Sequence, residues 1–130
     1  MLIDDNLLDI VSTEANSSPS HRINYFFNES LADKVQRLLY AMEPGTIIPI
    51  KSNPDTAETI IVLRGILKIT LYDKDKNIIE QYGLNPLNGK YGYHFTKGIW
   101  YSVETLAPNT VIFEVKDGTY TPLASEDIVK

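Results

Sequence analysis

The fold class follows from residues 58–72, which have the sequence ETIIVLRGILKITLY. This stretch is rich in β-branched and apolar residues, which are typical of strands. Arg64-Gly65 interrupts it with a residue that adopts turn conformations readily. The stretch therefore predicts two consecutive strands, over residues 58–63 and 66–72, joined by a tight turn.

The same pattern of short apolar runs separated by turn residues continues on both sides of this pair. Proline, glycine and asparagine mark the breaks at Pro44-Gly45, Lys97-Gly98 and Pro108-Asn109. Strands at spacings of about 8–12 residues predict an all-β sandwich or barrel, and the lack of strand–helix alternation disfavours a parallel sheet. The further predicted strands cover residues 35–42, 46–50, 78–82, 91–95, 99–106 and 110–115.

The two ends of the chain have a different pattern. Apolar residues within positions 1–16 recur at helical spacing, Asp4 and Asp5 suit a helix N-terminus, and Pro19 lies in the loop that follows. A chain of 130 residues is long enough for one sizeable core. We therefore expect a single domain over residues 1–130, with a helix over 1–16, a β-barrel over 22–120 and a loosely held tail over 121–130.

The composition excludes several classes of function. Twelve Lys and Arg residues against seventeen Asp and Glu residues give a formal net charge of −5, so we expect no nucleic-acid partner. No run of about 18 apolar residues is present, so no membrane span is expected. The chain has no cysteine, which excludes disulfides, thiolate zinc sites and cysteine nucleophiles. The first residues lack the basic segment of a signal peptide, and we expect a cytoplasmic protein.

Gly45 is followed by Glu58 and, after six more residues, by Gly65, and residues 96–101 follow the frame of a second motif. In these two stretches the chain resembles the cupin family. The first cupin motif contains a glycine, a His-x-His pair, a glutamate and, after six more residues, a second glycine. The resemblance implies a single jelly-roll β-barrel with a short N-terminal helix, which agrees with the strand pattern.

The chain is more closely similar to one branch, the small WbuC-type cupins, over nearly its whole length. The order and spacing of several phrases together carry this resemblance. Members of the branch often lie among genes for bacterial surface-polysaccharide synthesis, and cupins often form homodimers. The phrases are Ser18-Pro19, Arg22 with Asn24, residues 35–39, residues 44–46, residues 62–65, residues 98–100 and residues 113–120.

Cupins typically hold a divalent metal with three histidines and one glutamate. The resemblance places these four family ligand positions at Ile50, Ser52, Glu58 and Tyr101, so one ligand is retained and three are changed. An aliphatic side chain offers no lone pair, a hydroxyl is a poor ligand at neutral pH, and a phenol has an ordinary pKa near 10. We therefore expect no metal or other cofactor, while a divalent metal held by unusual ligands stays an alternative.

Glu58 has two interpretations. It can be a structural carboxylate paired with Lys51 or Arg64, or a buried acid with a raised pKa that serves binding or proton transfer. The two histidines, His21 and His94, are expected at the surface, since His94 faces outward if its neighbour faces inward. A site that combines both histidines with Glu58 stays an alternative.

Further candidates complete the expected binding cavity. Arg22, Asn24 and Arg37 form a polar set in which an arginine could clamp an anion or tie the helix to the barrel. Tyr101 is the candidate for the cavity wall among the aromatic residues, whereas Trp100 is expected to face away from the cavity. The expected cavity comprises Ile50, Ser52, Glu58, Tyr101, Arg22, Asn24 and Arg37.

These features and the resemblance predict a WbuC-like cupin with a degenerate metal site that binds a small molecule, a sugar or sugar nucleotide, in surface-polysaccharide synthesis. The main alternative is a metal-independent sugar-nucleotide isomerase or epimerase, with Glu58 as base and Tyr101 as acid. A metal-binding cupin with non-standard ligands and a purely structural partner protein are further alternatives. We expect a homodimer and no membrane partner.

Overall fold

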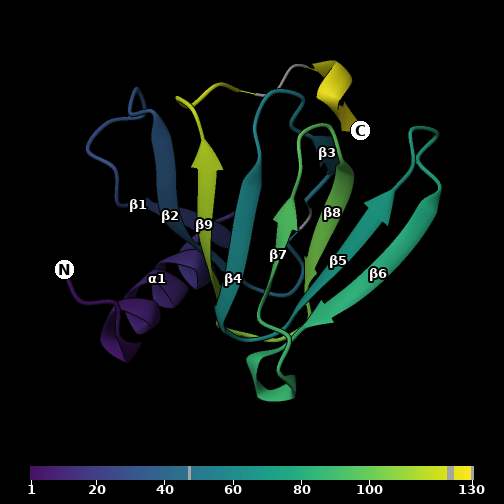
Figure 1. The fold of residues 1–130 in the computed structure, drawn as a ribbon. Coiled ribbons are helices and arrows are strands. Elements are labelled where there is room, and N and C mark those ends of the chain that lie inside the picture. The colour runs from purple at the N-terminus through teal and green to yellow at the C-terminus, as the bar shows by residue number, and fades with distance from the viewer. Residues whose placement is uncertain (47, 123–124, 130) are drawn as a thin grey trace.

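Two five-stranded antiparallel sheets face each other, with one helix packed outside the first sheet (Figure 1). The computed structural model describes residues 1–46, 48–122 and 125–129. Its elements are α1 (Asp5–Ser17), β1 (Arg22–Phe26), β2 (Val35–Met42), β3 (Ile50–Ser52), β4 (Glu58–Arg64), β5 (Leu67–Tyr72), β6 (Ile78–Leu84), the 3-10 turn η1 (Pro86–Asn88), β7 (Gly92–Phe95), β8 (Trp100–Thr105), β9 (Thr110–Asp117), the 3-10 turn η2 (Ser125–Asp127) and β10 (Ile128–Val129).

The strand order identifies a jelly roll, which confirms the expected fold class. One sheet has the order β1-β2-β9-β4-β7 and the other has the order β10-β3-β8-β5-β6. Strands adjacent in the sequence often lie in different sheets, as β3 and β4 do, so the chain crosses repeatedly between the two layers. Residues far apart in the sequence therefore line one shared interior.

The core between the sheets follows from alternation along the strands. In β4, Glu58, Ile60 and Val62 are buried, and the residues between them are more exposed. Since side chains alternate across a strand, this places one polar residue, Glu58, on the same inward face as two apolar ones. The buried apolar residues of the interior are Met42, Ile60, Val62, Leu67, Ile69, Leu71, Leu84, Phe95, Tyr101 and Ile112.

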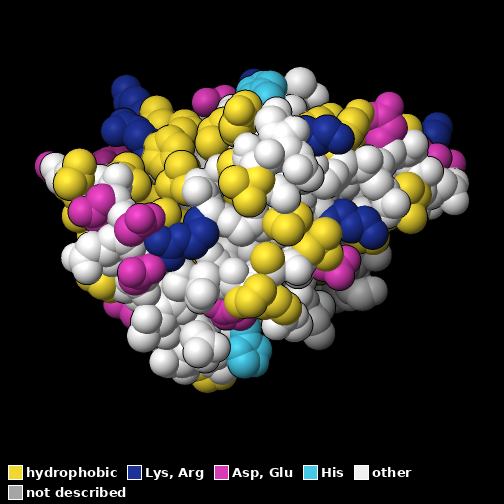
Figure 2. All heavy atoms as spheres, turned by 90° about the horizontal axis from the view of Figure 1, so that it is seen from below, with side chains coloured by type: hydrophobic (Ala, Val, Ile, Leu, Met, Phe, Trp, Pro, Cys, Tyr) yellow, Lys and Arg dark blue, Asp and Glu magenta, His cyan; other side chains and the backbone are white. Residues whose placement is uncertain are grey.

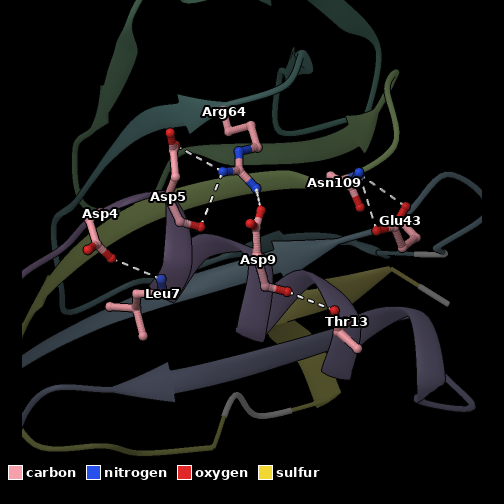
Figure 3. A network of polar contacts seen from close by, with 8 residues as sticks. All are labelled: Asp4, Asp5, Leu7, Asp9, Thr13, Glu43, Arg64 and Asn109. Carbon is pink, nitrogen blue, oxygen red and sulfur yellow. Dashed lines mark hydrogen bonds and ion pairs between the residues drawn. The ribbon is translucent and has the colours of Figure 1, made fainter.

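Helix α1 covers the outer face of the first sheet. Leu8, Val11 and Ala15 of the helix pack against Leu39 and Ala41 of β2 in a second apolar cluster. This stripe at helical spacing explains why the segment forms a helix there, because its apolar face is buried against the sheet. The Asp4 side chain accepts a hydrogen bond from the backbone N–H of Leu7 and caps the helix (Figure 3).

Arg64, the last residue of β4, forms ion pairs that tie helix α1 to the sheet. Arg64 lies between Asp5 and Asp9, with nitrogen–oxygen distances of 3.0 Å and 2.7 Å (Figure 3). Arg64 is therefore the partner of the helix carboxylates, and the sequence-based pairing of Arg64 with Glu58 is wrong. Nearby, the Glu43 carboxylate accepts a hydrogen bond from the backbone N–H of Asn109, which joins β2 to the start of β9.

The C-terminal segment differs from the expected loose tail. Ile128 and Val129 form β10, which pairs with Lys51 and Ile50 of β3. The expected strand over residues 46–50 begins at Ile50 instead, and residue 47 lies outside the described residues. Within the described part of the chain, neither α1 nor the short 3-10 turns has the length and apolar character needed to cross a bilayer.

Figure 2 shows the molecule from below, and on this face cationic and anionic side chains are interspersed with apolar ones. The blue side chains are separated from one another and several adjoin magenta ones. Positive and negative charges are therefore mixed on this face.

Candidate functional site

A small polar cavity lies in the barrel interior, between the two sheets. Its volume is about 20 Å³, which is room for about one water molecule. Five ionisable side chains from five different strands converge there, and they are Tyr40, Lys51, Glu58, Tyr101 and Glu114. The cavity is lined by Tyr40, Met42, Ile48, Lys51, Glu58, Ile60, Tyr101, Val103, Ile112 and Glu114.

Tyr101 of β8 faces Glu58 of β4 across this interior. The Tyr101 hydroxyl donates a hydrogen bond to Glu58 Oε1 over 3.0 Å, and the two residues are 2% and 3% exposed. The Tyr101 ring stacks on Phe95 with 4.0 Å between ring centroids, which fixes its orientation. Burial, followed by the charges of Glu58 and Glu114, raises the pKa of Tyr101 well above 10, so its hydroxyl stays a proton donor.

Glu114 of β9 is the second carboxyl group of the cluster, and the sequence-based reasoning missed it. In the β4–β9 pair, Glu114 lies opposite Ile60 and Lys116 lies opposite Glu58. Burial, the charge of Glu58 and a side-chain hydrogen bond with Glu58 raise the pKa of Glu114 to about 8. A hydrogen bond between two carboxyl groups requires a proton between them, so the pair carries about one negative charge at neutral pH.

Two lysines supply the positive charge of the cluster. Lys51 of β3 pairs with Tyr101 across the sheet, and its Nζ lies 5.5 Å from the centre of the Tyr101 ring. Lys116 of β9 is half-buried, and burial together with the charge of Lys51 lowers its pKa, while Glu58 and Glu114 act in the opposite direction. The interior cluster therefore balances carboxylates with ammonium groups of the chain itself.

The cluster makes stability depend on pH, and Glu114→Gln should remove this dependence. The ordinary pKa of a glutamate, 4.5, is raised to about 8 in the folded protein. Between these values the folded protein binds more protons than the unfolded chain, so the free energy of unfolding falls as the pH rises through this window. A glutamine is neutral at every pH, so the free energy of unfolding of the variant should not fall in this way. As the pH rises from about 5 to about 8, the variant should therefore become more stable relative to wild type.

Urea unfolding of both proteins at the two pH values measures this effect. Glu104→Gln, on an exposed position of β8, is the matched control and should follow the wild-type pH dependence. An unchanged pH dependence in Glu114→Gln would show that Glu114 titrates as an ordinary surface carboxyl group.

The structure shifts two of the expected cavity positions by one residue. Lys51 and Tyr101 are strand partners on the cavity side, whereas Ser52 is the partner of Trp100, on the opposite side of the sheet. Ile50 and Ser52 are not among the residues that line the cavity. Since side chains alternate along a strand, the cavity side carries Lys51, with Asn53 next on that side, in place of the expected Ile50 and Ser52.

Asn53 completes the cluster on the side of Tyr101. It is 5% exposed, and its side chain forms a hydrogen bond with Tyr101 that lowers the pKa of the phenol, against the larger effect of burial. Asn53 Oδ1 is buried and has no hydrogen-bond partner within the described part of the molecule. The side chains gathered around Glu58 therefore offer an amine, an amide, a carboxyl group and a phenol.

This set of donors does not fit a divalent metal. An ammonium group has no lone pair to donate, and a protonated phenol and an amide are weak ligands for first-row metals. Among the described residues, no group of three or more His, Asp or Glu side chains is arranged to hold a metal ion. That the purified protein contains no metal stays a prediction, and elemental analysis tests it.

The remaining sequence-predicted residues lie outside the cavity wall. Arg22 of β1 is half-buried, and its charge acts against the burial that raises the pKa of Tyr40, so it lies near the cluster without lining the cavity. Asn24 of β1 and Arg37 of β2 are both exposed. The expected polar set therefore does not converge on one point.

The histidines and Trp100 also point away from the interior. His94 is exposed and its Nδ1 lies 2.7 Å from the Thr59 hydroxyl, whereas Phe95 is 1% exposed. His21 is exposed in a loop with a positive φ of 57°. Trp100 lies on the outer face of its sheet, where Lys76 Nζ is 3.8 Å from its ring centre. A site that combines both histidines with Glu58 is therefore not formed.

A larger cleft opens directly beside the cluster, at the upper end of the barrel in Figure 1, where the β3–β4 connection, the end of β9 and η2 meet. Its volume is about 350 Å³. Lys116 and Asn53 line the cleft and also interact with the interior cluster. The cleft is lined by Asn53, Pro54, Asp55, Thr56, Lys116, Thr119, Thr121, Pro122, Glu126 and Asp127.

Similar solved structures share this fold. Oxalate oxidase in complex with the substrate analogue glycolate is 13% identical, with a TM-score of 0.61 and 83% of this chain covered. The chain spans 56% of the length of that oxalate oxidase. KdgF from Halomonas sp. is 10% identical, with a TM-score of 0.63 and coverages of 79% of this chain and 84% of that protein.

The cupin domain of Cnp3 from Schizosaccharomyces pombe is 14% identical, with a TM-score of 0.54, and the match covers 76% of this chain and 64% of that domain. These similarities show a cupin fold. The comparison with curated proteins finds no match. Residues 3–84 match the sequence profile of a family described as "Domain of unknown function (DUF6016)".

Proposed function

The chain belongs to the DUF6016 family, whose description states no activity, and on the strength of the site we propose that it is a cupin that binds a small polar molecule without a metal at the cupin ligand position. The observation that carries this proposal is a cleft of about 350 Å³ beside a polar cluster whose side chains, amine, amide, carboxyl and phenol, do not suit a metal. Ligand pockets of small molecules usually start at about this size.

The lining of the cleft favours a sugar. Threonine hydroxyls, carboxylates and the Asn53 amide can exchange hydrogen bonds with several hydroxyl groups of a ligand. Three carboxylates and one lysine give the lining an excess of negative charge, which would repel the diphosphate of a sugar nucleotide. The ligand we propose is therefore an unphosphorylated sugar. The hydroxyl groups come from Thr56, Thr119 and Thr121, and the carboxylates come from Asp55, Glu126 and Asp127.

The resemblance to WbuC-type cupins supports this ligand class, since those proteins are found among genes for surface-polysaccharide synthesis. A role in that synthesis, and a homodimer as the working assembly, are part of the proposal. The exposed edge strand β6 offers a physical reason for pairing, because its residues from Ile78 to Gly83 are solvent-exposed.

A second candidate is the isomerase or epimerase with Glu58 as base and Tyr101 as acid. Their hydrogen bond of 3.0 Å favours it, whereas the raised pKa of Tyr101 makes its phenol a weaker acid. Both side chains are nearly fully buried, however, and the cavity beside them holds about one water molecule. Binding in the outer cleft therefore fits the geometry better. Turnover of a 4-keto-sugar nucleotide that Glu58→Gln abolishes would instead support the isomerase.

Calorimetric titration of the purified protein with a panel of monosaccharides, before and after treatment with a chelator, tests the proposed function. We expect saturable binding that the chelator leaves unchanged. Asp55→Ala should weaken it by about tenfold or more, because a charge-assisted hydrogen bond to a ligand hydroxyl is worth about 1.5–3 kcal/mol. Glu104→Ala, which removes an exposed carboxylate outside the cleft, should bind like wild type. Binding that disappears with the chelator would contradict a metal-free site.

A further inference from the structure

We propose that Lys116 is a carbonyl-reactive lysine, which forms a Schiff base with the open-chain aldehyde or ketone form of a sugar in the cleft. This inference deepens the proposed function and rests on it. Lys116 lines the open cleft on one side and faces the buried carboxyl pair on the other. It thus brings an amine that a ligand can reach together with groups that can move protons.

The strand pairing fixes this position. Lys116 is the partner of Glu58 in the β4–β9 pair, so both side chains lie on the same face of the sheet. Glu114 precedes Lys116 by two residues and lies on that face as well. The amine, the carboxylate and the protonated carboxyl group are therefore held on rigid strands, below the loops that line the cleft.

The surroundings make the Lys116 ammonium group easier to deprotonate, and the neutral amine is the nucleophilic form. Burial lowers the pKa of Lys116, and the nearby ammonium group of Lys51 on β3 lowers it further. Glu58 on β4 and Glu114 on β9 act in the opposite direction, but the pair shares a proton at neutral pH. A desolvated lysine beside a second cation is a recognised route to an activated amine.

The carboxyl pair can supply the protons that imine formation requires. The Lys116 amine attacks the carbonyl carbon, a C–N bond forms, and a proton passes from nitrogen to oxygen to give the carbinolamine. The protonated carboxyl group, Glu114, then donates a proton to the hydroxyl group, which leaves as water while the C=N bond forms. The carbonyl oxygen leaves in that water, and no oxidant or reductant takes part.

Reductive trapping tests the inference. The protein is incubated at neutral pH with glyceraldehyde and sodium cyanoborohydride, and digested peptides are examined by mass spectrometry. We expect Lys116 to gain the mass of glyceraldehyde less one oxygen atom several-fold faster than the exposed lysines Lys90 and Lys97, which serve as internal controls. Equal or slower labelling of Lys116 would overturn the proposal, because any free surface lysine reacts slowly with aldehydes.

Two variants separate a reactive amine from a merely accessible one. Lys116→Arg keeps the positive charge but cannot form an imine, so the fast labelling should disappear while circular dichroism shows an intact fold. Glu114→Gln should slow labelling at Lys116 and leave labelling at Lys90 unchanged, since an amide is a poor proton donor. Labelling at Lys116 that is as fast in Glu114→Gln as in wild type would overturn the role of the carboxyl pair.

Competition distinguishes this inference from the proposed function. A sugar that binds in the calorimetric titration should protect Lys116 from glyceraldehyde, because both occupy the same cleft. Saturable sugar binding without selective labelling of Lys116 would overturn the Schiff base and leave the binding function standing. If no sugar binds and Lys116 is not labelled selectively, both the Schiff base and the binding function are overturned.

Discussion

A variant with the three changes Lys51→His, Asn53→His and Tyr101→His is expected to bind about one equivalent of Ni(II) or Zn(II) per chain. These positions converge on the Glu58 carboxylate, since Tyr101 donates a hydrogen bond to it, Lys51 pairs with Tyr101 and Asn53 is hydrogen-bonded to Tyr101. Three imidazoles and one carboxylate suit a first-row metal. The metal would also replace the positive charge that Lys51 brings to the carboxyl pair.

Elemental analysis after dialysis measures this gain, with wild type expected below about a tenth of an equivalent. The matched control is a variant with Ile50→His, Ser52→His and Tyr101→His, which adds the same three histidines in the register predicted from sequence. Its first two changes lie on the face of β3 opposite to Lys51, where Ser52 pairs with Trp100, so it should bind no more metal than wild type. Equal metal content in the two triple variants would contradict the register of β3.

Gly65→Ala is expected to destabilise the protein by about 3 kcal/mol or more, through strain and overpacking together. Gly65 ends the turn after β4 with a φ of 94°, a conformation that costs an L-residue about 1–2 kcal/mol. A Cβ at this position would also lie 2.7 Å from the Thr110 Cα and closer still to the Thr110 hydroxyl. Thr110 is fully buried at the start of β9, so it cannot move aside at low cost.

Gly45→Ala provides the control for this prediction. Gly45 has the same φ of 94°, but a Cβ there would have no heavy atom within 4 Å. This variant should lose only the conformational part, about 1–2 kcal/mol, in urea unfolding experiments. If both variants lose the same stability, close packing against Thr110 contributes nothing measurable.

The local pattern of the sequence was enough to predict most of the secondary structure. Residues 58–72 form the two predicted strands because β-branched and apolar side chains suit a strand that packs into a core, and Gly65 permits the turn between them. The alternation of side chains along a strand correctly separates buried Phe95 from exposed His94. The N-terminal helix forms because its apolar stripe repeats at helical spacing, and its start is within a few residues of the prediction.

The register of β3 could not be read from the sequence, because its three residues carry no alternation. Ile50 and Lys51 are both half-buried and Ser52 is buried, and β10 and β8 flank the strand on its two sides. Neither hydrophobicity nor polarity therefore indicates which face of the strand is inward. The pairing of Lys51 with Tyr101 decides it, and this pairing joins residues fifty positions apart.

The sequence by itself determined an all-β chain with a short N-terminal helix, the loss of the histidines that a cupin metal site needs, and Glu58 as the residue retained from that site. The tertiary structure alone placed Glu114 and Lys116 beside Glu58 and opened the cleft above them. The physical reason is that strand periodicity is local, whereas the pKa of a carboxyl group depends on burial and on charges brought close by strands distant in the sequence.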